Sequence, residues 1–235
     1  MLSLLPEIAN KKVIVVIPVF NDTQTIRQVV EELVQQTPFI ILVIDDGSAM
    51  PVKHYLSGLP VICLRHRINL GQGAALQTGF SYAHRLEPDI VITFDADGQH
   101  SVSDLPLLAK PIALHETSVV LGSRFIQAAG NQTPLLRSMI LKTARYVNYL
   151  LSGILLTDAH NGLRAFSGEA LNKILITENR MAHASEILFE IRRHQLSYKE
   201  VGVHVHYTDY SKQKGQTAWD SVKILFDLVL HKIFK

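Results

Sequence analysis

Apolar segments of strand length recur along the chain, and amphipathic segments of helical length separate several of them. The five apolar segments are "KKVIVVIPVF", "FIILVIDDGS", "PVICLRH", "DIVITFDADGQH" and "TSVVLGSRF". Because their apolar runs are continuous, we expect both faces of each strand to be buried, as in a mostly parallel sheet. Residues 21–36 illustrate the intervening segments, with apolar side chains at helical spacing. The sequence therefore predicts an α/β fold in which helices cover both faces of a mostly parallel central sheet.

The chain after Arg124 follows a different order. We expect a long helical stretch to about Leu155, then a short segment "NGLRAFS", a helix near "HASEILFEIRRHQL", a strand "SYKEVGVHVHY", a Lys-rich loop and a last helix. Neither a linker nor an internal repeat separates the two parts. We therefore predict a single domain over residues 1–235.

The composition fits a folded globular protein and narrows its partners. Hydrophobic residues make up 47% of the chain and charged residues 19%, which argues against disorder. The net charge is +2 and the basic residues are dispersed, so we expect no nucleic-acid partner. The single cysteine, Cys63, lies in an apolar segment, which indicates a core position in a reducing compartment. The start lacks signal-peptide features, and the most apolar region, residues 135–156, carries three basic residues, so we expect no membrane span and a cytoplasmic protein.

Polar residues collect where the predicted strands end. The four clusters are Pro18 to Asp22, Asp45 to Ser48, Asp95 to His100 and Gly122 to Arg124. Ligands bind beyond the carboxyl ends of strands in such sheets, so we expect these clusters to form one site. The pair Asp95 and Asp97 needs a positive partner, and its oxygens suit Mg²⁺ or Mn²⁺ bound with a diphosphate better than zinc. Arg124 would bring a second positive group to the same phosphates.

Each motif has a simpler explanation when taken alone. An Asp-x-Asp pair and the "DDGS" segment both occur in ordinary turns after strands. The segment "NLGQGAAL" contains Gly-x-Gly, but Leu76 stands where the dinucleotide fingerprint has its third Gly or Ala, which argues against a dinucleotide site. His204 and His206 alternate near Asp209, and we predict an exposed strand face there rather than a zinc site. The shared placement of the clusters is what favours a functional site.

In order and spacing, these motifs resemble the inverting glycosyltransferases of family 2, which have the GT-A fold, and among them the dolichyl or polyprenyl phosphate sugar synthase branch. The resemblance runs from about Val13 to Thr217. The matching segments are "VIPVFND", "VIDDGS", "NLGQGAALQTGF", "DADGQH", "GSRF", "LLRSMILKTARYVNYLL" and "DAHNGLRAFS". The resemblance implies a Rossmann-like nucleotide-sugar-binding half over about residues 12–124 and an acceptor-side half over residues 125–216. Residues 217–235 are predicted from their own pattern to form a C-terminal amphipathic helix.

The resemblance also implies which residues bind the donor. The nucleoside pocket is expected to be lined by Pro18, Phe20, Asp22 and Asp45, with Asp46 in support. Phe20 and Asp22 stand where this branch usually has Tyr and Glu. The metal, Mg²⁺ or Mn²⁺, and the diphosphate are expected to be held by Asp95, Asp97 and Gln99.

For the reaction itself, the resemblance implies a second set of residues. Arg124 and Arg137 are expected to face the donor diphosphate and the acceptor phosphate. Asp158 is expected beside the reacting sugar. A lysine of "YSKQKGQT", either Lys212 or Lys214, is expected to close over phosphate.

The function implied is inverting transfer of a sugar from a nucleoside diphosphate sugar to a polyprenyl phosphate. Two other interpretations stay open: a family 2 enzyme acting on a sugar hydroxyl in polysaccharide or glycolipid assembly, and a non-catalytic donor-binding assembly subunit. A nucleotidyltransferase is disfavoured because "PVFND" stands where such an enzyme has a Gly-rich basic loop.

The C-terminal segment "AWDSVKILFDLVLHKIFK" has a broad apolar stripe at helical spacing and three lysines. Packing of this helix on the domain is one explanation. The other is docking on the inner face of the membrane or on a small membrane partner protein, which would bring the enzyme to a lipid acceptor. The sequence leaves the oligomeric state open.

Overall fold

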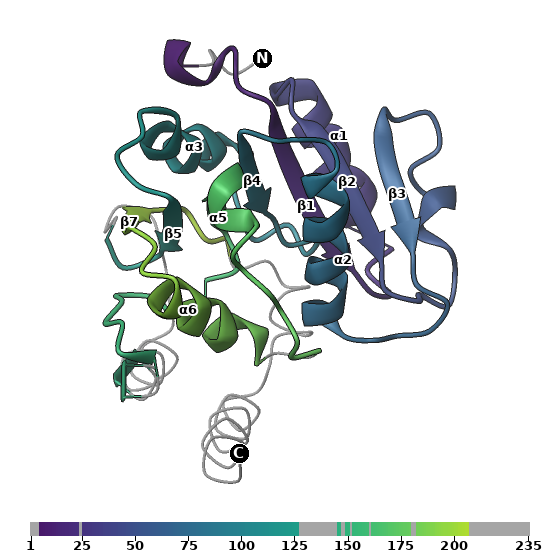
Figure 1. The fold of residues 1–235 in the computed structure, drawn as a ribbon. Coiled ribbons are helices and arrows are strands. Elements are labelled where there is room, and N and C mark those ends of the chain that lie inside the picture. The colour runs from purple at the N-terminus through teal and green to yellow at the C-terminus, as the bar shows by residue number, and fades with distance from the viewer. Residues whose placement is uncertain are drawn as a thin grey trace, which may run out of the picture.

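The computed structural model describes residues 5–23, 25–126, 145–146, 149–150, 152–159, 161–179 and 182–206. These residues form a seven-stranded sheet in the order β3-β2-β1-β4-β6-β5-β7 (Figure 1). Its strands are β1 (Val13–Val19), β2 (Ile40–Asp45), β3 (Val61–Arg65), β4 (Ile90–Thr93), β5 (Val119–Ser123), β6 (Arg164–Ser167) and β7 (Tyr198–Gly202). Strand β6 runs antiparallel to both of its neighbours, and the other pairs are parallel. The predicted mostly parallel sheet is confirmed.

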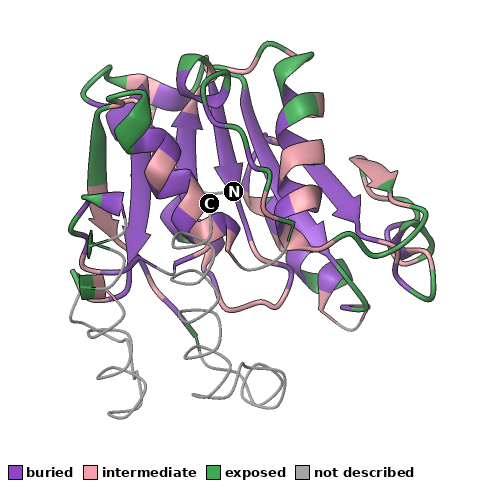
Figure 2. Cartoon of the chain, turned by 60° about the horizontal axis from the view of Figure 1, so that its bottom comes forward, coloured by how far each residue is buried: buried purple, intermediate pink, exposed green. Residues whose placement is uncertain are grey.

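Helices cover both faces of this sheet. They are α1 (Ile26–Gln36), α2 (Gln72–His84), α3 (Leu105–Ala113), α5 (Gly168–Leu171) and α6 (His183–Arg193), with short 3-10 helices η1 (Pro6–Ile8), η2 (Val52–His54) and η3 (Val102–Asp104). Successive residues of β1 point to opposite faces, so Val15 packs in one core with Leu33 of α1, and Val16 packs in the other with Phe80 of α2. The central strands are buried beneath these helices, whereas the edge strands β3 and β7 are partly exposed (Figure 2). Burial from both sides explains why β1 is apolar without alternation.

Two elements differ from the expectation. The "NGLRAFS" segment, expected only as a short connection, contains β6, which is inserted between β4 and β5. The strand expected over residues 197–207 ends at Gly202, so the prediction that His204 and His206 lie on a strand face is wrong. The cause is the buried carboxylate of Asp104, which accepts a hydrogen bond from the His204 backbone N at 2.6 Å and lies 2.9 Å from its Nδ1.

Other predicted elements fall outside the described residues. These are the Lys-rich loop, the helix over residues 217–235 and most of the helical stretch before Leu155, of which residues 145–146 and 149–150 are described as helical. In the described parts of the chain, no helix combines the length and the apolar character needed to span a membrane.

The strand ends converge at one edge of the sheet. Val19 of β1 is in register with Asp45 of β2, and Thr93 of β4 is in register with Arg164 of β6. Because β6 runs in the opposite direction, it begins where the parallel strands end. We call this edge the rim: the residues that follow β1, β2, β4 and β5 and those that precede β6.

Candidate active site

The first feature of the rim is the Asp95 carboxylate, directly after β4. Its Oδ1 accepts a hydrogen bond from Gln72 Nε2 at 3.3 Å, and its Oδ2 lies 3.2 Å from His100 Nε2. Burial opposes ionisation of Asp95, but the hydrogen bond and charge of His100, together with the charges of His183 and Arg164, outweigh it. The pKa of Asp95 therefore lies below its ordinary value, and the group is a carboxylate at neutral pH.

The pKa of Asp97, two residues after Asp95, is shifted in the opposite direction. Its Oδ1 accepts the backbone N–H of Gln99 at 3.0 Å. Burial, followed by repulsion from Asp95, raises the pKa of Asp97 to about 6, against the weaker opposing effects of the Gln99 hydrogen bond and His100. Asp97 thus carries negative charge that its surroundings compensate poorly. A cation at this position would relieve that cost.

The Asp95–His100 segment is also held by the chain that leaves β7. His100 and Val205 form an isolated antiparallel bridge, and the His206 backbone N donates to the Gln99 carbonyl at 2.8 Å. The His204–Asp104 contact adds a third link between the same two regions. The backbone around the acidic pair is therefore fixed by residues of the C-terminal part of the chain.

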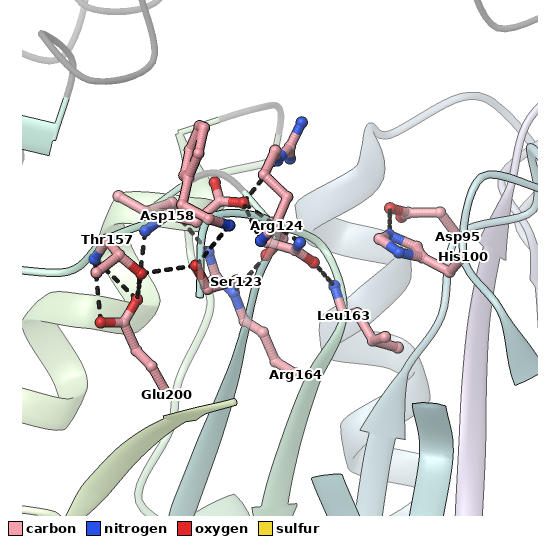
Figure 3. A network of polar contacts seen from close by, with 12 residues as sticks. Asp95, His100, Ser123, Arg124, Thr157, Asp158, Leu163, Arg164 and Glu200 are labelled. Atoms are coloured by element: carbon pink, nitrogen blue, oxygen red, sulfur yellow. Dashed lines mark hydrogen bonds and ion pairs between the residues drawn. The ribbon is translucent and has the colours of Figure 1, made fainter. Parts of the chain in front are cut away.

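The second feature of the rim is a buried ion pair between Arg124, after β5, and Asp158 (Figure 3). Asp158 Oδ2 accepts hydrogen bonds from Arg124 Nε at 2.6 Å and from the Arg124 backbone N at 3.2 Å. Asn161 Nδ2 lies 3.4 Å from the same oxygen. The other oxygen, Oδ1, is buried and has no hydrogen-bond partner among the described residues. Burying such an oxygen costs free energy unless a ligand donates a hydrogen bond to it or brings positive charge near it.

Arg164, at the start of β6, binds the backbone of the loop before β6 and of the first turn of α6. Its guanidinium donates to three carbonyls, those of Asn161 at 3.1 Å, Ala184 at 3.1 Å and Ala159 at 3.0 Å. Burial lowers the pKa of Arg164 to about 10, against the opposing attraction of Asp158 and Asp95. Arg164 therefore remains a cation at neutral pH and fixes the backbone between Asp158 and the sheet. Arg164 lies in the matching segment "DAHNGLRAFS", but no role was predicted for it.

A hydroxyl and carboxylate network lies beneath Asp158 (Figure 3). The carboxylate of Glu200, in β7, accepts the Thr157 backbone N–H at 2.8 and 3.0 Å and the Thr157 hydroxyl at 2.7 Å. It also lies 3.3 Å from the Asp158 backbone N. Ser123 Oγ, at the end of β5, is 2.6 Å from Thr157 Oγ1. Glu200 was not among the predicted site residues, because it lies in a partly exposed strand and nothing in its spacing distinguishes it from a surface acid.

The acidic residues after β2 serve the local backbone. Asp45 accepts the backbone N–H groups of Ser48 at 2.9 Å and Val52 at 3.0 Å. The Asp46 carboxylate accepts hydrogen bonds from the backbone N–H groups of Leu70 and Gly71 at 2.9 and 2.7 Å and from Asn69 Nδ2 at 2.9 Å. It also lies 2.7 Å from His66 Nδ1. Both aspartates are almost fully buried. They shape the loops that lead to η2 and α2, and their predicted contact with a nucleoside stays a prediction.

The residues after β1 lie beside these loops. Pro18 is buried within the strand, whereas the Phe20 side chain is 43% exposed and free to stack on a planar ligand. Asp22 is buried, and the Thr25 hydroxyl lies 3.1 Å from its Oδ1 and 2.7 Å from the carbonyl of Ala96. This hydroxyl links the end of β1 to the segment that carries Asp95 and Asp97. The three residues predicted to line the nucleoside pocket from β1 therefore reach the rim.

A glycine lets the two halves approach closely at the centre of the rim. A Cβ atom on Gly162 would clash with the Asp95 carboxylate, so any other residue at this position would displace that side chain. The Gly162 carbonyl accepts the Thr93 hydroxyl at 2.7 Å, so the loop before β6 is held against the end of β4. The glycine of the "DAHNGLRAFS" segment thus lets the loop approach Asp95 without moving its carboxylate.

The residues present fit a divalent cation bound together with phosphate. In the described parts of the chain, no three His, Cys, Asp or Glu side chains converge as a metal cluster. The protein therefore offers a partial set of oxygens, chiefly from Asp97 and Asp95, and the poorly compensated charge of Asp97 is the observation that suits it to a cation. Diphosphate oxygens would complete the shell, as Mg²⁺ commonly requires.

Most of the predicted site residues meet at this rim. The structure brings together Pro18, Phe20, Asp22, Asp45, Asp46, Asp95, Asp97, Gln99, Arg124 and Asp158. Arg137, Lys212 and Lys214, predicted to bind phosphate, lie outside the described residues. Gln72, Arg164 and Glu200 are additions that the sequence analysis did not identify.

This fold and rim are typical of α/β proteins that bind ligands beyond the carboxyl ends of parallel strands. The chain belongs to glycosyl transferase family 2, whose family model matches residues 14–175. The predicted family and its GT-A fold are thereby confirmed.

The relatives support the predicted branch of that family. The chain is 31% identical to UDP-N-acetylglucosamine–dolichyl-phosphate N-acetylglucosaminyltransferase of Methanococcus voltae, over 97% of this chain and 98% of the relative. It is 28% identical to polyprenol monophosphomannose synthase of Mycolicibacterium smegmatis, over 70% of this chain and 65% of the relative. It is also 35% identical to an uncharacterised protein of Methanocaldococcus jannaschii, over 99% and 97% of the two chains.

Among solved structures, the fold resembles glucosyl-3-phosphoglycerate synthase from Mycobacterium tuberculosis in complex with Mn²⁺, uridine diphosphate and glucosyl-3-phosphoglycerate. The TM-score is 0.67 and the match covers 94% of this chain and 81% of the other, at 16% identity. At this identity the likeness supports the fold alone. The same enzyme has also been solved with Mg²⁺ and uridine diphosphate, with a TM-score of 0.63 at 17% identity.

Proposed function

We propose that this protein transfers a sugar from a nucleoside diphosphate sugar to a polyprenyl phosphate, with inversion at the anomeric carbon. The observation that carries the proposal is the state of Asp158. One of its oxygens is paired with Arg124, and the other is buried without a partner among the described residues. Asp158 is held as the partner of the buried Arg124 guanidinium. This carboxylate is therefore suited to orient groups and to stabilise positive charge that develops on the sugar.

A phosphate acceptor fits such a site because it brings its own nucleophile. The second ionisation of a phosphate monoester lies near pH 6, so an anionic oxygen is already available at neutral pH. No general base is then required, whereas a sugar hydroxyl would need one. Attack by this oxygen on the face opposite the leaving diphosphate gives inversion.

The donor would lie across the rim, from Phe20 and the loop after β2 toward Asp158. Asp95, Asp97 and Gln99 would hold a Mg²⁺ or Mn²⁺ ion, which supplies positive charge to the departing diphosphate when bound. Arg124 would approach the same phosphates while it orients Asp158. The relatives named for dolichyl phosphate and polyprenol products support a lipid phosphate as the acceptor.

Arg137, Lys212, Lys214 and the C-terminal helix complete the proposal but lie outside the described residues. We propose that the basic residues bind the acceptor phosphate. The single-domain boundaries, docking of the helix on the inner membrane face or on a small membrane partner, and peripheral location there stay predictions.

A second acceptor class is favoured by one feature of the site. The unpartnered Oδ1 of Asp158 could accept a proton from a sugar hydroxyl, which would make the protein a transferase of polysaccharide or glycolipid assembly.

The test compares matched acceptors. Purified protein is incubated with a panel of labelled nucleotide sugars and either polyprenyl phosphate, the same polyprenol without phosphate, or free sugars. We expect label in an acid-labile lipid only with the phosphate. Equal labelling of free sugars would instead favour the hydroxyl acceptor, and label in no product would point to a non-catalytic donor-binding subunit.

A further inference from the structure

Glu200 stands outside the residues that meet the substrates, yet it holds the segment that presents Asp158. Its carboxylate accepts hydrogen bonds from the backbone N and the hydroxyl of Thr157 and lies 3.3 Å from the Asp158 N. These contacts connect β7 to a loop more than forty residues earlier in the chain. A carboxylate that receives several N–H and O–H donors fixes a peptide plane firmly, because charge-assisted hydrogen bonds are stronger than neutral ones.

The same network reaches Arg124 by a second path. The Thr157 hydroxyl lies 2.6 Å from Ser123 Oγ, and Ser123 Oγ accepts the Phe125 backbone N–H at 3.1 Å. Ser123 and Phe125 flank Arg124, whose N and Nε both bind Asp158 Oδ2. Arg124 and Asp158 are therefore both held by the same network, which consists of Ser123, Thr157 and Glu200.

The orientation of Asp158 matters because its two oxygens have different roles. Oδ2 binds Arg124, and Oδ1 is buried without a hydrogen-bond partner among the described residues. A rotation of the Thr157–Asp158 peptide would exchange or misplace the two oxygens without unfolding the sheet. Small misplacements of reacting groups can cost about 100-fold in rate.

We propose that Glu200 is a positioning residue of the active site: through Thr157 and Ser123 it sets the orientation of Asp158 against Arg124. This inference rests on the proposed role of Asp158 in sugar transfer. It assigns to β7, the edge strand of the sheet, a part in the reaction.

The first test compares Glu200→Ala and Glu200→Gln with a matched control, Glu116→Gln. Glu116 pairs with Lys199, the neighbour of Glu200 in β7, but both members of that pair are about half exposed. We expect the turnover number of Glu200→Ala to fall on the order of 10- to 100-fold. Gln retains one acceptor oxygen, so Glu200→Gln should recover part of the loss, and Glu116→Gln should match the wild type. Nucleotide affinity should change less than about twofold in all three.

A double-mutant cycle separates positioning from general stabilisation. If Glu200 acts through Asp158, then Glu200→Gln should add little to the loss already caused by Asp158→Asn. Independent, multiplying losses would overturn the proposal, as would unchanged turnover in Glu200→Ala. Should Glu200→Ala fail to fold, the cycle with Glu200→Gln still decides.

A measurement that needs no substrate keeps this inference distinct from the proposed function. Hydrogen exchange should quicken at least about tenfold at the Thr157 and Asp158 amides in Glu200→Ala, or in Glu200→Gln if the alanine variant is not folded, and not in Glu116→Gln. Unchanged exchange there would overturn the support role whatever the reaction is. Failure of the wild type to transfer sugar, with exchange altered as expected, would reject only the proposed function.

Discussion

The rim carries two pairs of aspartates, all of them at or near strand ends. One pair is Asp45 and Asp46, and the other is Asp97 and Asp158. Asp45 accepts backbone N–H groups of the loop that follows it, and Asp46 accepts backbone and side-chain donors of the loop before α2. Asp97 instead has a raised pKa, and Asp158 has an oxygen without a described partner. From this difference we propose that the first pair builds the site and the second pair serves a ligand.

This contrast follows from the cost of buried charge. A carboxylate that several N–H groups surround is satisfied within the protein and has little to gain from a ligand. A carboxylate next to another one, or with an unpaired oxygen, is held at a cost that only binding removes. Loss of the first kind should lower stability, and loss of the second kind should lower activity.

The largest expected effect is on turnover. Asp97→Asn removes the charge at the proposed metal position, and we expect sugar transfer to fall at least about 100-fold. Asp89→Asn is the control, because Asp89 precedes the same strand at its opposite end and is partly exposed. Initial rates with saturating donor and acceptor measure both variants, and near-normal turnover in Asp97→Asn would remove Asp97 from the site.

The next effect is on stability. Asp46→Ala leaves the Leu70 and Gly71 amides without their acceptor, and we expect it to lower the free energy of unfolding by about 3 kcal/mol. Turnover per folded molecule should fall less than tenfold. Urea denaturation measures the loss, with Glu31→Ala, from an exposed pair with Arg27, as a control expected to cost less than about 1 kcal/mol. A stable but inactive Asp46→Ala would place Asp46 among the ligand-binding residues instead.

The smallest effect has the opposite sign. The pKa of Asp97 is raised in the folded state, so the folded protein binds more protons than the unfolded chain between about pH 4 and pH 6. Stability from this group is therefore full below that window and is lost as the pH rises through it. Without metal, Asp97→Asn should stabilise the protein at pH 7.5 by about 1–3 kcal/mol, and the gain should shrink at pH 5. Thermal unfolding at both pH values checks this, and destabilisation at pH 7.5 would count against the poorly compensated charge.

The sequence predicts the sheet well because burial from both faces leaves a direct pattern in the residues. The continuous apolar run of β1 needs no tertiary information to be recognised. Strand β6 is only four residues long and runs antiparallel, so its insertion depends on neighbours that are distant in the chain. The end of β7 depends on Asp104, about one hundred residues away.

The same reasoning explains which site residues could be predicted. Asp95, Asp97, Arg124 and Asp158 lie in recognisable motifs, and the rim brings them together. The sequence does not show whether backbone N–H groups donate to a given aspartate, since the donors to Asp46 come from a loop more than twenty residues later. Glu200 was missed for the same reason, because its partners are known only from the structure.

The most direct test of the account is Mn²⁺ binding measured by electron paramagnetic resonance, with and without a nucleoside diphosphate. In this spectrum the signal of free Mn²⁺ falls as the ion is bound. We predict that the wild type and Glu31→Ala bind the ion tightly only when the nucleotide is present, because phosphate oxygens must complete the shell around Asp95 and Asp97. Asp97→Asn should lose this binding. Equal binding by Asp97→Asn and the wild type, or wild-type binding of equal strength without nucleotide, would contradict the account.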